Sequence, residues 1–249
     1  MARRVAASLL AAAVVGTDAV SARRDDCECK HWYGAYKVAG SQCGQANEFA
    51  FITNRSNLMG VELSMVRDQY GAEICEHFFT RFAESSCLNV NVGNDYGQWC
   101  YVSPMCRELN GGSKVLGVDL AWKRCVHEEK SMRDFMPEKL GSLSHELDID
   151  LGMLHKFSYP LYKAKLWKDV QWAWYGQGSA GPMPMKLHQE MKEIIASGRY
   201  YSFDTSIDGM PPHRIVKGLK VWSVAPVKES NEYKPGQWFR LSCISHCDE

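Results

Sequence analysis

The chain has no long apolar run downstream of its N-terminal segment and no excess of charge of either sign. A membrane-spanning helix needs about 20 consecutive apolar residues, and charged side chains interrupt every apolar stretch beyond residue 22. The 29 Lys and Arg residues balance the 29 Asp and Glu residues. A balanced chain does not attract nucleic acid or anionic membranes. We therefore predict no nucleic-acid partner, and no membrane span once the N-terminal segment is removed.

The short motifs of common hydrolases are absent as well. The sequence contains neither the H-E-x-x-H zinc motif nor the G-x-S-x-G nucleophile motif. The cysteine count is even, so no thiol stands out as a nucleophile. The eight histidines are each interpreted as surface or hydrogen-bonded residues: His31, His77, His127, His145, His155, His188, His213 and His246. The sequence thus predicts no catalytic residue.

The N-terminus has the three parts of a signal peptide. Arg3 and Arg4 are followed by eleven apolar or small residues, 5–15, and Val20-Ser21-Ala22 provides small residues for cleavage. We expect residues 1–22 to be removed and the protein to enter the secretory pathway, with an extracellular or lumenal location. Removal takes away two arginines and one aspartate and leaves a net charge of −1.

The triplet Asn54-Arg55-Ser56 is an N-glycosylation acceptor. In an exported protein such a site must be reached from solvent. We therefore expect Asn54 to lie on the surface of a glycoprotein.

All ten cysteines lie beyond the predicted cleavage site. An even number of cysteines in an exported chain indicates disulfides, because the secretory pathway oxidises thiols. Zinc is the alternative, but zinc sites favour repeated pairs separated by two to four residues, and only the last two cysteines have that spacing. We predict disulfides and no metal site for Cys27, Cys29, Cys43, Cys75, Cys87, Cys100, Cys106, Cys125, Cys243 and Cys247.

The cysteine distribution suggests two domains. Eight cysteines fall between Cys27 and Cys125, and the next 117 residues contain none. We predict a disulfide-rich domain of mixed helix and strand at 23–126, a charged linker at 127–142 and a second domain at 143–249. The second domain is expected to pack helices on a small antiparallel sheet, so the fold class is α+β.

Periodicity places the main elements of the first half. Tyr70, Ile74, Phe78 and Phe82 recur every four residues and predict one helical face. A short helix is expected from Ser103-Pro104 to Gly111, and alternation predicts a strand at 115–126.

The second half is predicted to begin with one helix. Its apolar face is formed by the leucines Leu140, Leu143, Leu147, Leu151 and Leu154. A second helix is expected at 185–196, with Gly198 as its stop. Strands are predicted at 199–203, 215–224 and 237–243.

The run Gly176 to Gly181 spells G-x-G-x-x-G, a pattern found in dinucleotide-binding units. Residues 170–175 would be the preceding strand, but they carry two tryptophans, and Pro182 and Pro184 occupy the first turn of the expected helix. Buried parallel strands are instead rich in Val and Ile. We interpret the run as a loop and predict no cofactor.

Four aromatic residues form the densest aromatic group of the chain: Trp167, Trp172, Trp174 and Tyr175. If exposed, these rings suit contact with a sugar or a partner protein. If buried, they form the core of the second half. The sequence leaves both interpretations open.

These observations predict an exported, disulfide-stabilised binding or structural protein with an unidentified protein or carbohydrate partner. The alternative is a secreted hydrolase whose histidines and carboxylates are scattered along the sequence.

Overall fold

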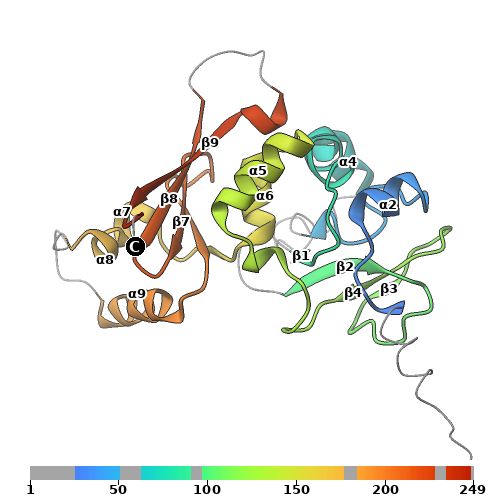
Figure 1. The fold of residues 1–249 in the computed structure, drawn as a ribbon, viewed down its shortest axis with the longest axis horizontal. Helices are drawn as coiled ribbons and strands as arrows, with labels where there is room; N and C mark the ends of the chain where they lie inside the picture. Colours follow the sequence, from blue (N-terminus) through green and yellow to red (C-terminus); the bar gives the residue numbers. More distant parts are fainter. Residues whose placement is uncertain (1–25, 51–62, 91–96, 177–183, 228–233, 248–249) are drawn as a thin grey trace, which may run out of the picture.

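The computed structural model describes residues 26–50, 63–90, 97–176, 184–227 and 234–247. The predicted signal peptide, Asn54 and most of the glycine-rich run lie outside these residues. No helix within the described ranges is both long and apolar enough to cross a bilayer. The fold is α+β, as predicted, with two sheets on either side of a central pair of helices (Figure 1).

The first sheet has the strand order β1-β2-β4-β3 and is antiparallel. Its strands are β1 (Leu88–Asn89), β2 (Gln98–Val102), β3 (Ser113–Lys114) and β4 (Ala121–Arg124). All five residues of β2 are buried. Helix α2 (Trp32–Lys37) lies beside β2 and buries Trp32, whose ring meets that of Trp99 edge-on at 4.7 Å.

Helix α4 (Leu63–Gly71) continues directly into the π-helix η2 (Ala72–Phe79). A π-helix is wound more loosely than an α-helix, which agrees with the four-residue spacing of the apolar side chains. Ile74, Phe78 and Phe82 are buried as expected, but Tyr70 lies in the α-helical part and is 37% exposed. The predicted face therefore begins at Ile74.

Two helices occupy the centre of the molecule: α5 (Pro137–Leu147) and α6 (Leu151–Ser158) (Figure 1). The sequence predicted a single helix here, which is wrong. Asp148 adopts a left-handed conformation with φ of 52°, and Asp150 caps α6 by accepting a hydrogen bond from the Met153 amide. Both features end one helix and begin another. The short 3-10 helix η3 (Met132–Asp134) precedes α5.

The second sheet has the order β5-β6-β7-β8-β9. Its strands are β5 (Leu161–Tyr162), β6 (Tyr201–Asp204), β7 (His213–Lys217), β8 (Lys220–Pro226) and β9 (Phe239–Ser245). The β5–β6 pair is parallel and the others are antiparallel. Strand β9 stands at the end of this order, and the 3-10 helix η4 (Pro235–Gln237) leads into it.

Three short or amphipathic helices flank this sheet: α7 (Trp167–Val170), α8 (Trp172–Tyr175) and α9 (Met185–Ser197). Helix α9 ends at Gly198, whose φ of 61° is the left-handed conformation that the predicted stop requires. Residues 170–175 are helical rather than the strand that a nucleotide-binding unit would need.

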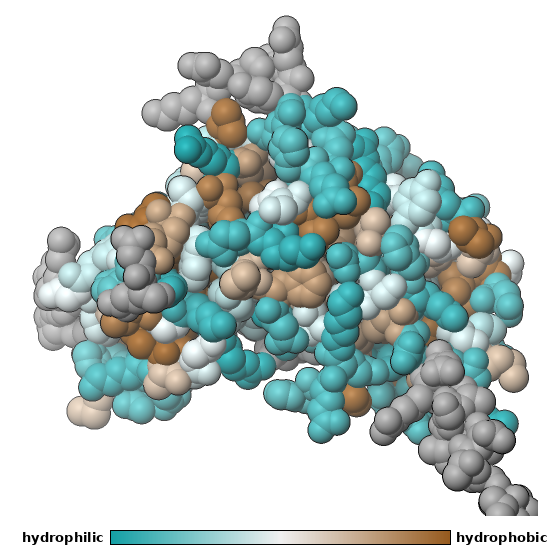
Figure 2. Space-filling view, in the orientation of Figure 1, coloured by the Kyte–Doolittle hydropathy of each residue, from teal (hydrophilic) through white to brown (hydrophobic). Residues whose placement is uncertain are grey.

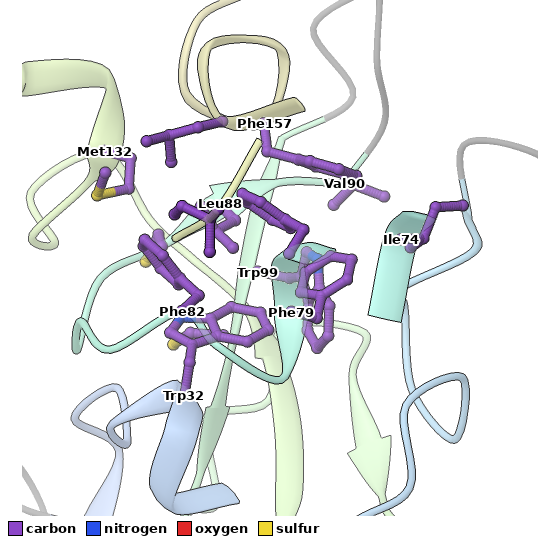
Figure 3. Packing of buried hydrophobic residues seen from close by; sticks show 14 of the residues in the cluster. Trp32, Ile74, Phe79, Phe82, Leu88, Val90, Trp99, Met132 and Phe157 are labelled. Atoms are coloured by element: carbon purple, nitrogen blue, oxygen red, sulfur yellow. The ribbon is translucent and has the colours of Figure 1, made fainter. Parts of the chain in front are cut away.

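The buried residues of the described ranges form two clusters. The larger one gathers the rings of Trp32, Phe79, Phe82 and Trp99, which lie close together in Figure 3. It extends through α5 and α6 to Trp222 and Val224 in the second sheet. The smaller cluster packs α7, α8 and α9 on the other side of that sheet, around Phe203.

The predicted linker contains regular structure. Both η3 and the start of α5 fall within 127–142, and Phe157 of α6 stacks on Phe78 at 5.0 Å. The central helices therefore share a core with the disulfide-rich half. The division into independently stable domains remains a prediction.

Three further predictions about strands and helices are wrong. Residues 103–106 form a turn and not a helix, with the Cys106 amide bonded to the Ser103 carbonyl. The expected strand at 115–126 is confined to β4, because the chain turns at Gly117, where φ is 77°. The expected strand at 215–224 is a hairpin that reverses at Gly218, where φ is 56°.

The ten cysteines form five disulfides, as predicted: Cys27–Cys106, Cys29–Cys100, Cys43–Cys75, Cys87–Cys125 and Cys243–Cys247. Four of these bonds tie together segments of the first half that are 32 to 79 residues apart. They close long loops, which is where a cross-link restricts the unfolded chain most.

Candidate functional site

A cleft of about 710 Å³ opens between the two sheets. The lining residues come from six separate segments: Gly97, Gln98, Cys125, Val126, His127, Ser131, Arg133, Asp134, Pro160, Gly198, Arg199, Tyr200 and Lys217. In the space-filling view, hydrophilic residues predominate along the lower middle of the molecule, between the α9 side and the first sheet (Figure 2). The volume lies in the range typical of small-molecule sites.

The cleft is basic, although the chain as a whole is balanced. Among the described residues that line it, Arg133, Arg199 and Lys217 are the cations and Asp134 is the one carboxylate. Three cationic side chains around one concave site attract an anion more strongly than the same charges spread over a convex surface.

Hydrogen bonds fix the first-sheet wall of the cleft. Gln98 is buried and donates through Nε2 to the Ser131 Oγ at 2.5 Å. Ser131 Oγ also accepts from the Arg133 amide at 2.9 Å, and the Arg133 Nε donates to Asn89 Oδ1 at 2.9 Å. The guanidinium of Arg133 is therefore held in place before any ligand arrives.

The opposite wall is built around Tyr200, the residue just before β6. Its ring stacks on that of Tyr159 at 4.8 Å, and the Lys217 Nζ lies 4.5 Å from its centroid. Burial, reinforced by the charge of Glu138, raises the pKa of the Tyr200 hydroxyl. Tyr200 is thus a neutral support that positions the ammonium group of Lys217.

A disulfide forms part of the first-sheet wall. Cys125 lines the cleft and is bonded to Cys87, which is fully buried. The sulfurs of Cys29, Cys87, Cys100 and Cys125 lie within 4.8 Å of one another. Zinc binds cysteine as the thiolate, and in this structure the four sulfurs are paired as disulfides.

A second polar group is buried behind the second sheet. His155 Nδ1 lies 3.0 Å from Ser202 Oγ, and the rings of His155 and His213 are 4.8 Å apart. His213 Nδ1 lies 3.1 Å from Asp204 Oδ1, although the two atoms are not aligned as a hydrogen bond. Lys156 is 3.7 Å from the same carboxylate and donates to the Gly209 carbonyl. These are the residue types that the hydrolase alternative requires.

Burial controls the charge of this group. It lowers the pKa of His155 well below the ordinary value, and the neighbouring His213 and Lys156 lower it further. Burial also lowers the pKa of His213, although Asp204 opposes this effect. For Asp204, burial alone would raise the pKa, but His213 and Lys156 outweigh it and the pKa falls. The result is two neutral imidazoles beside a Lys–Asp ion pair.

This arrangement is closed to a substrate. Ser202 and His155 are 0% exposed, and His213 is 2% exposed. A nucleophilic hydroxyl must contact the bond that it attacks, and the Ser202 hydroxyl cannot do so in this conformation. Ser202 and the two histidines therefore act here as a buried polar cluster within the core.

The predicted aromatic group is brought together, but most of it faces inward. Trp167 and Trp174 are 4% and 3% exposed and pack against Phe203. Trp172 stacks on His188 at 5.1 Å, and Tyr175 is 37% exposed. Trp172 and Tyr175 alone retain surface for contact with a ligand.

No pattern in the sequence indicates the cleft. Arg133, Arg199 and Lys217 are far apart in the chain, and no spacing connects them. His127 and Cys125 were recognised only as members of the histidine and cysteine lists. Comparison with protein-family models, curated proteins and solved structures found no match to this chain.

Proposed function

We propose that this chain is an exported binding protein whose basic cleft holds a small anionic ligand. The observation that carries the proposal is the placement of Arg133, Arg199 and Lys217 around one concave site whose described lining residues include one carboxylate, Asp134. The five disulfides and the predicted signal peptide support export, because disulfides persist in oxidising compartments.

The geometry favours recognition of sulfate, carboxylate or phosphate groups. Arginine presents a planar set of donors that fits such groups in a bidentate manner, whereas lysine acts as a mobile point charge. Arg133 is already held by Asn89 and Lys217 lies over Tyr200. Groups ordered in advance lose less entropy when they bind.

We propose a sulfated saccharide as the ligand. The sequence analysis expects a protein or carbohydrate partner for an exported chain, and the cleft is of a size that holds a small molecule. The Asp134 carboxylate suits sugar hydroxyls, while the three cations suit sulfate groups. A phosphate or carboxylate ligand would use the same cations and is an outcome that the test distinguishes.

The experiment compares binding of a heparin disaccharide with binding of its unsulfated counterpart, by isothermal titration calorimetry at low salt. The sulfated form should bind, and Arg199→Gln and Lys217→Gln should each weaken it about tenfold, since a hydrogen bond to a charged group contributes about 1.5–3 kcal/mol. Lys186→Gln is the matched control, because Lys186 is on α9, is 89% exposed and does not line the cleft.

Affinity should fall as salt is added, since exposed charges are screened. Tighter binding of inorganic phosphate or citrate than of the disaccharide would replace the saccharide with another anion. If none of these anions binds, or if Lys186→Gln weakens binding as much as Arg199→Gln, the proposed function is wrong.

A further inference from the structure

The disulfides Cys29–Cys100 and Cys87–Cys125 are close enough to exchange partners. The sulfur of Cys29 lies 3.4 Å from that of Cys87, and the sulfur of Cys125 lies 3.8 Å from that of Cys100. Each sulfur therefore has its bonded partner and a second sulfur near van der Waals contact. Within the described residues, this is the only such group of four cysteines.

The strand register explains the grouping. Leu88 pairs with Trp99, so Cys87 precedes β1 at the position beside Cys100. Trp99 pairs with Arg124, and the Cys125 amide donates to the Gln98 carbonyl, which brings Cys125 to the same edge. The segment that carries Cys29 runs along β2 through a hydrogen bond from the Lys30 amide to the Tyr101 carbonyl.

We propose that this quartet is a thiol–disulfide exchange site, in which a small thiolate entering the cleft converts the pairing into Cys29–Cys87 and Cys100–Cys125. The exchange uses the same cleft as the proposed function, but it requires only that a small thiol can reach Cys125. The external thiol acts as a catalyst and is neither oxidised nor reduced overall.

The external thiolate attacks Cys125 Sγ, forms a mixed disulfide and releases the thiolate of Cys87. Cys87, now free to rotate onto the axis of the neighbouring bond, attacks Cys29 Sγ, forms Cys29–Cys87 and releases the thiolate of Cys100. Cys100 attacks Cys125 Sγ, forms Cys100–Cys125 and expels the external thiolate. Three sulfur–sulfur bonds form and three break.

The reaction is expected to start at Cys125. Cys87 and Cys100 are 0% exposed, whereas Cys125 is half-buried and lines the cleft. Neighbouring Arg and Lys side chains stabilise a thiolate, and Arg199 and Lys217 face the same space. The original disulfides join residues that are 71 and 38 positions apart, and the exchanged disulfides would join residues that are 58 and 25 positions apart. Because these loop lengths are similar, the entropy of the unfolded chain does not strongly favour either pairing.

The test treats the native protein with a small amount of reduced glutathione, then quenches with acid and maps the peptides without reduction. Peptides that join Cys29 to Cys87 and Cys100 to Cys125 should appear in equal amounts, while the protein retains five disulfides. The proposal is overturned if Cys243–Cys247 exchanges with glutathione while both quartet bonds keep their original partners. It is also overturned if free thiols accumulate at the quartet without new pairs.

Two variants separate a relay from simple reduction. Cys29→Ser/Cys100→Ser removes the second disulfide, so the Cys87 thiolate has no bond to attack and the mixed disulfide at Cys125 should accumulate. Cys43→Ser/Cys75→Ser removes a disulfide outside the quartet and should leave the exchange unchanged. If the first variant does not fold, peptide mapping of the glutathione-treated native protein still tests whether the partners exchange.

The choice of thiol separates this proposal from the proposed function. Arg199→Gln should slow exchange by glutathione, which carries carboxylates besides its thiolate, by about threefold to tenfold, and should slow exchange by mercaptoethanol less. Equal rates with glutathione would count against anion attraction in the cleft and would leave the exchange itself intact. Absence of exchange with either thiol would refute the exchange alone.

Discussion

Glu48 offers a sharp test of how the disulfide-rich half is stabilised. Its carboxyl group is fully buried beneath β2. One oxygen accepts hydrogen bonds from Tyr36 at 2.8 Å and from Tyr101, and the other accepts from the Ala46 amide at 3.1 Å. Burial raises the pKa of Glu48, although these hydrogen bonds oppose the rise.

The raised pKa has a defined effect on stability. An unfolded glutamate has a pKa of about 4.3. Between that value and the higher pKa of the folded protein, the folded state holds a proton that the unfolded state has lost. The contribution of Glu48 is therefore complete at pH values below 4.3 and is lost as pH rises, by up to about 1.4 kcal/mol per pH unit, until the folded pKa is passed.

Glu48→Gln removes this titration. A glutamine has one acceptor oxygen, so either the Ala46 amide or the tyrosine hydroxyls lose a partner, at a cost of about 1 kcal/mol at every pH. The variant should thus be less stable than the wild type near pH 4. The difference should shrink as pH rises toward the folded pKa of Glu48.

The assay is urea denaturation with intact disulfides at pH values from 4 to 8, followed by tryptophan fluorescence, which reports on Trp32 and Trp99 in the same core. Taking the difference between variant and wild type cancels groups such as Asp150, whose pKa burial raises to about 6. A difference that does not change with pH would refute the reasoning, because it would mean that Glu48 keeps one protonation state throughout.

Three further predictions follow from the packing. His155→Gln should reduce the loss of stability on acidification, because histidine in the unfolded chain takes up a proton below about pH 6.5, whereas buried His155 resists protonation. Denaturation curves at pH 7 and pH 5 test this, and the same loss of stability in variant and wild type would contradict it. Phe78→Ala should lower the free energy of unfolding by about 3–5 kcal/mol, whereas Tyr33→Ala, at a ring that is 46% exposed, should change it by less than about 1 kcal/mol; similar losses would argue against the core assignment. Reduction of the disulfides should loosen α6 together with the first half, because Phe157 of α6 stacks on Phe78. Limited proteolysis of the reduced protein should then yield a resistant fragment that begins after Ser158. A resistant fragment that begins near residue 130 would show that α5 and α6 are stable without that contact.

Local signals in the sequence were enough for some elements. Helix α9 was placed correctly because its apolar positions and Gly198 act within one segment. The α+β class followed from similar local patterns. The cysteine count and the predicted export indicated disulfides, but not the five pairings, since those depend on which strands are neighbours.

Other features depended on single residues whose effect comes from their surroundings. Asp148 divides a continuous leucine pattern into α5 and α6, where its carboxylate accepts from Arg81 at 2.7 Å and from the Gly236 amide at 3.2 Å. Those partners are far away in the sequence. The cleft is a similar case, since its cations meet only after both sheets have formed around the central helices.

The position of β9 at the end of the second sheet has a consequence for self-association. An outer strand exposes unpaired backbone groups that invite another chain to add to the sheet. Here Arg240, Ser242 and Ile244 are the exposed residues of β9, so a charged and a polar side chain precede the single apolar one. The Cys243–Cys247 bond then turns the chain back within five residues, with His246 at a φ of 51°. A copy of this protein approaching along β9 would meet a cation and a covalently closed turn, which disfavours growth of the sheet into an aggregate.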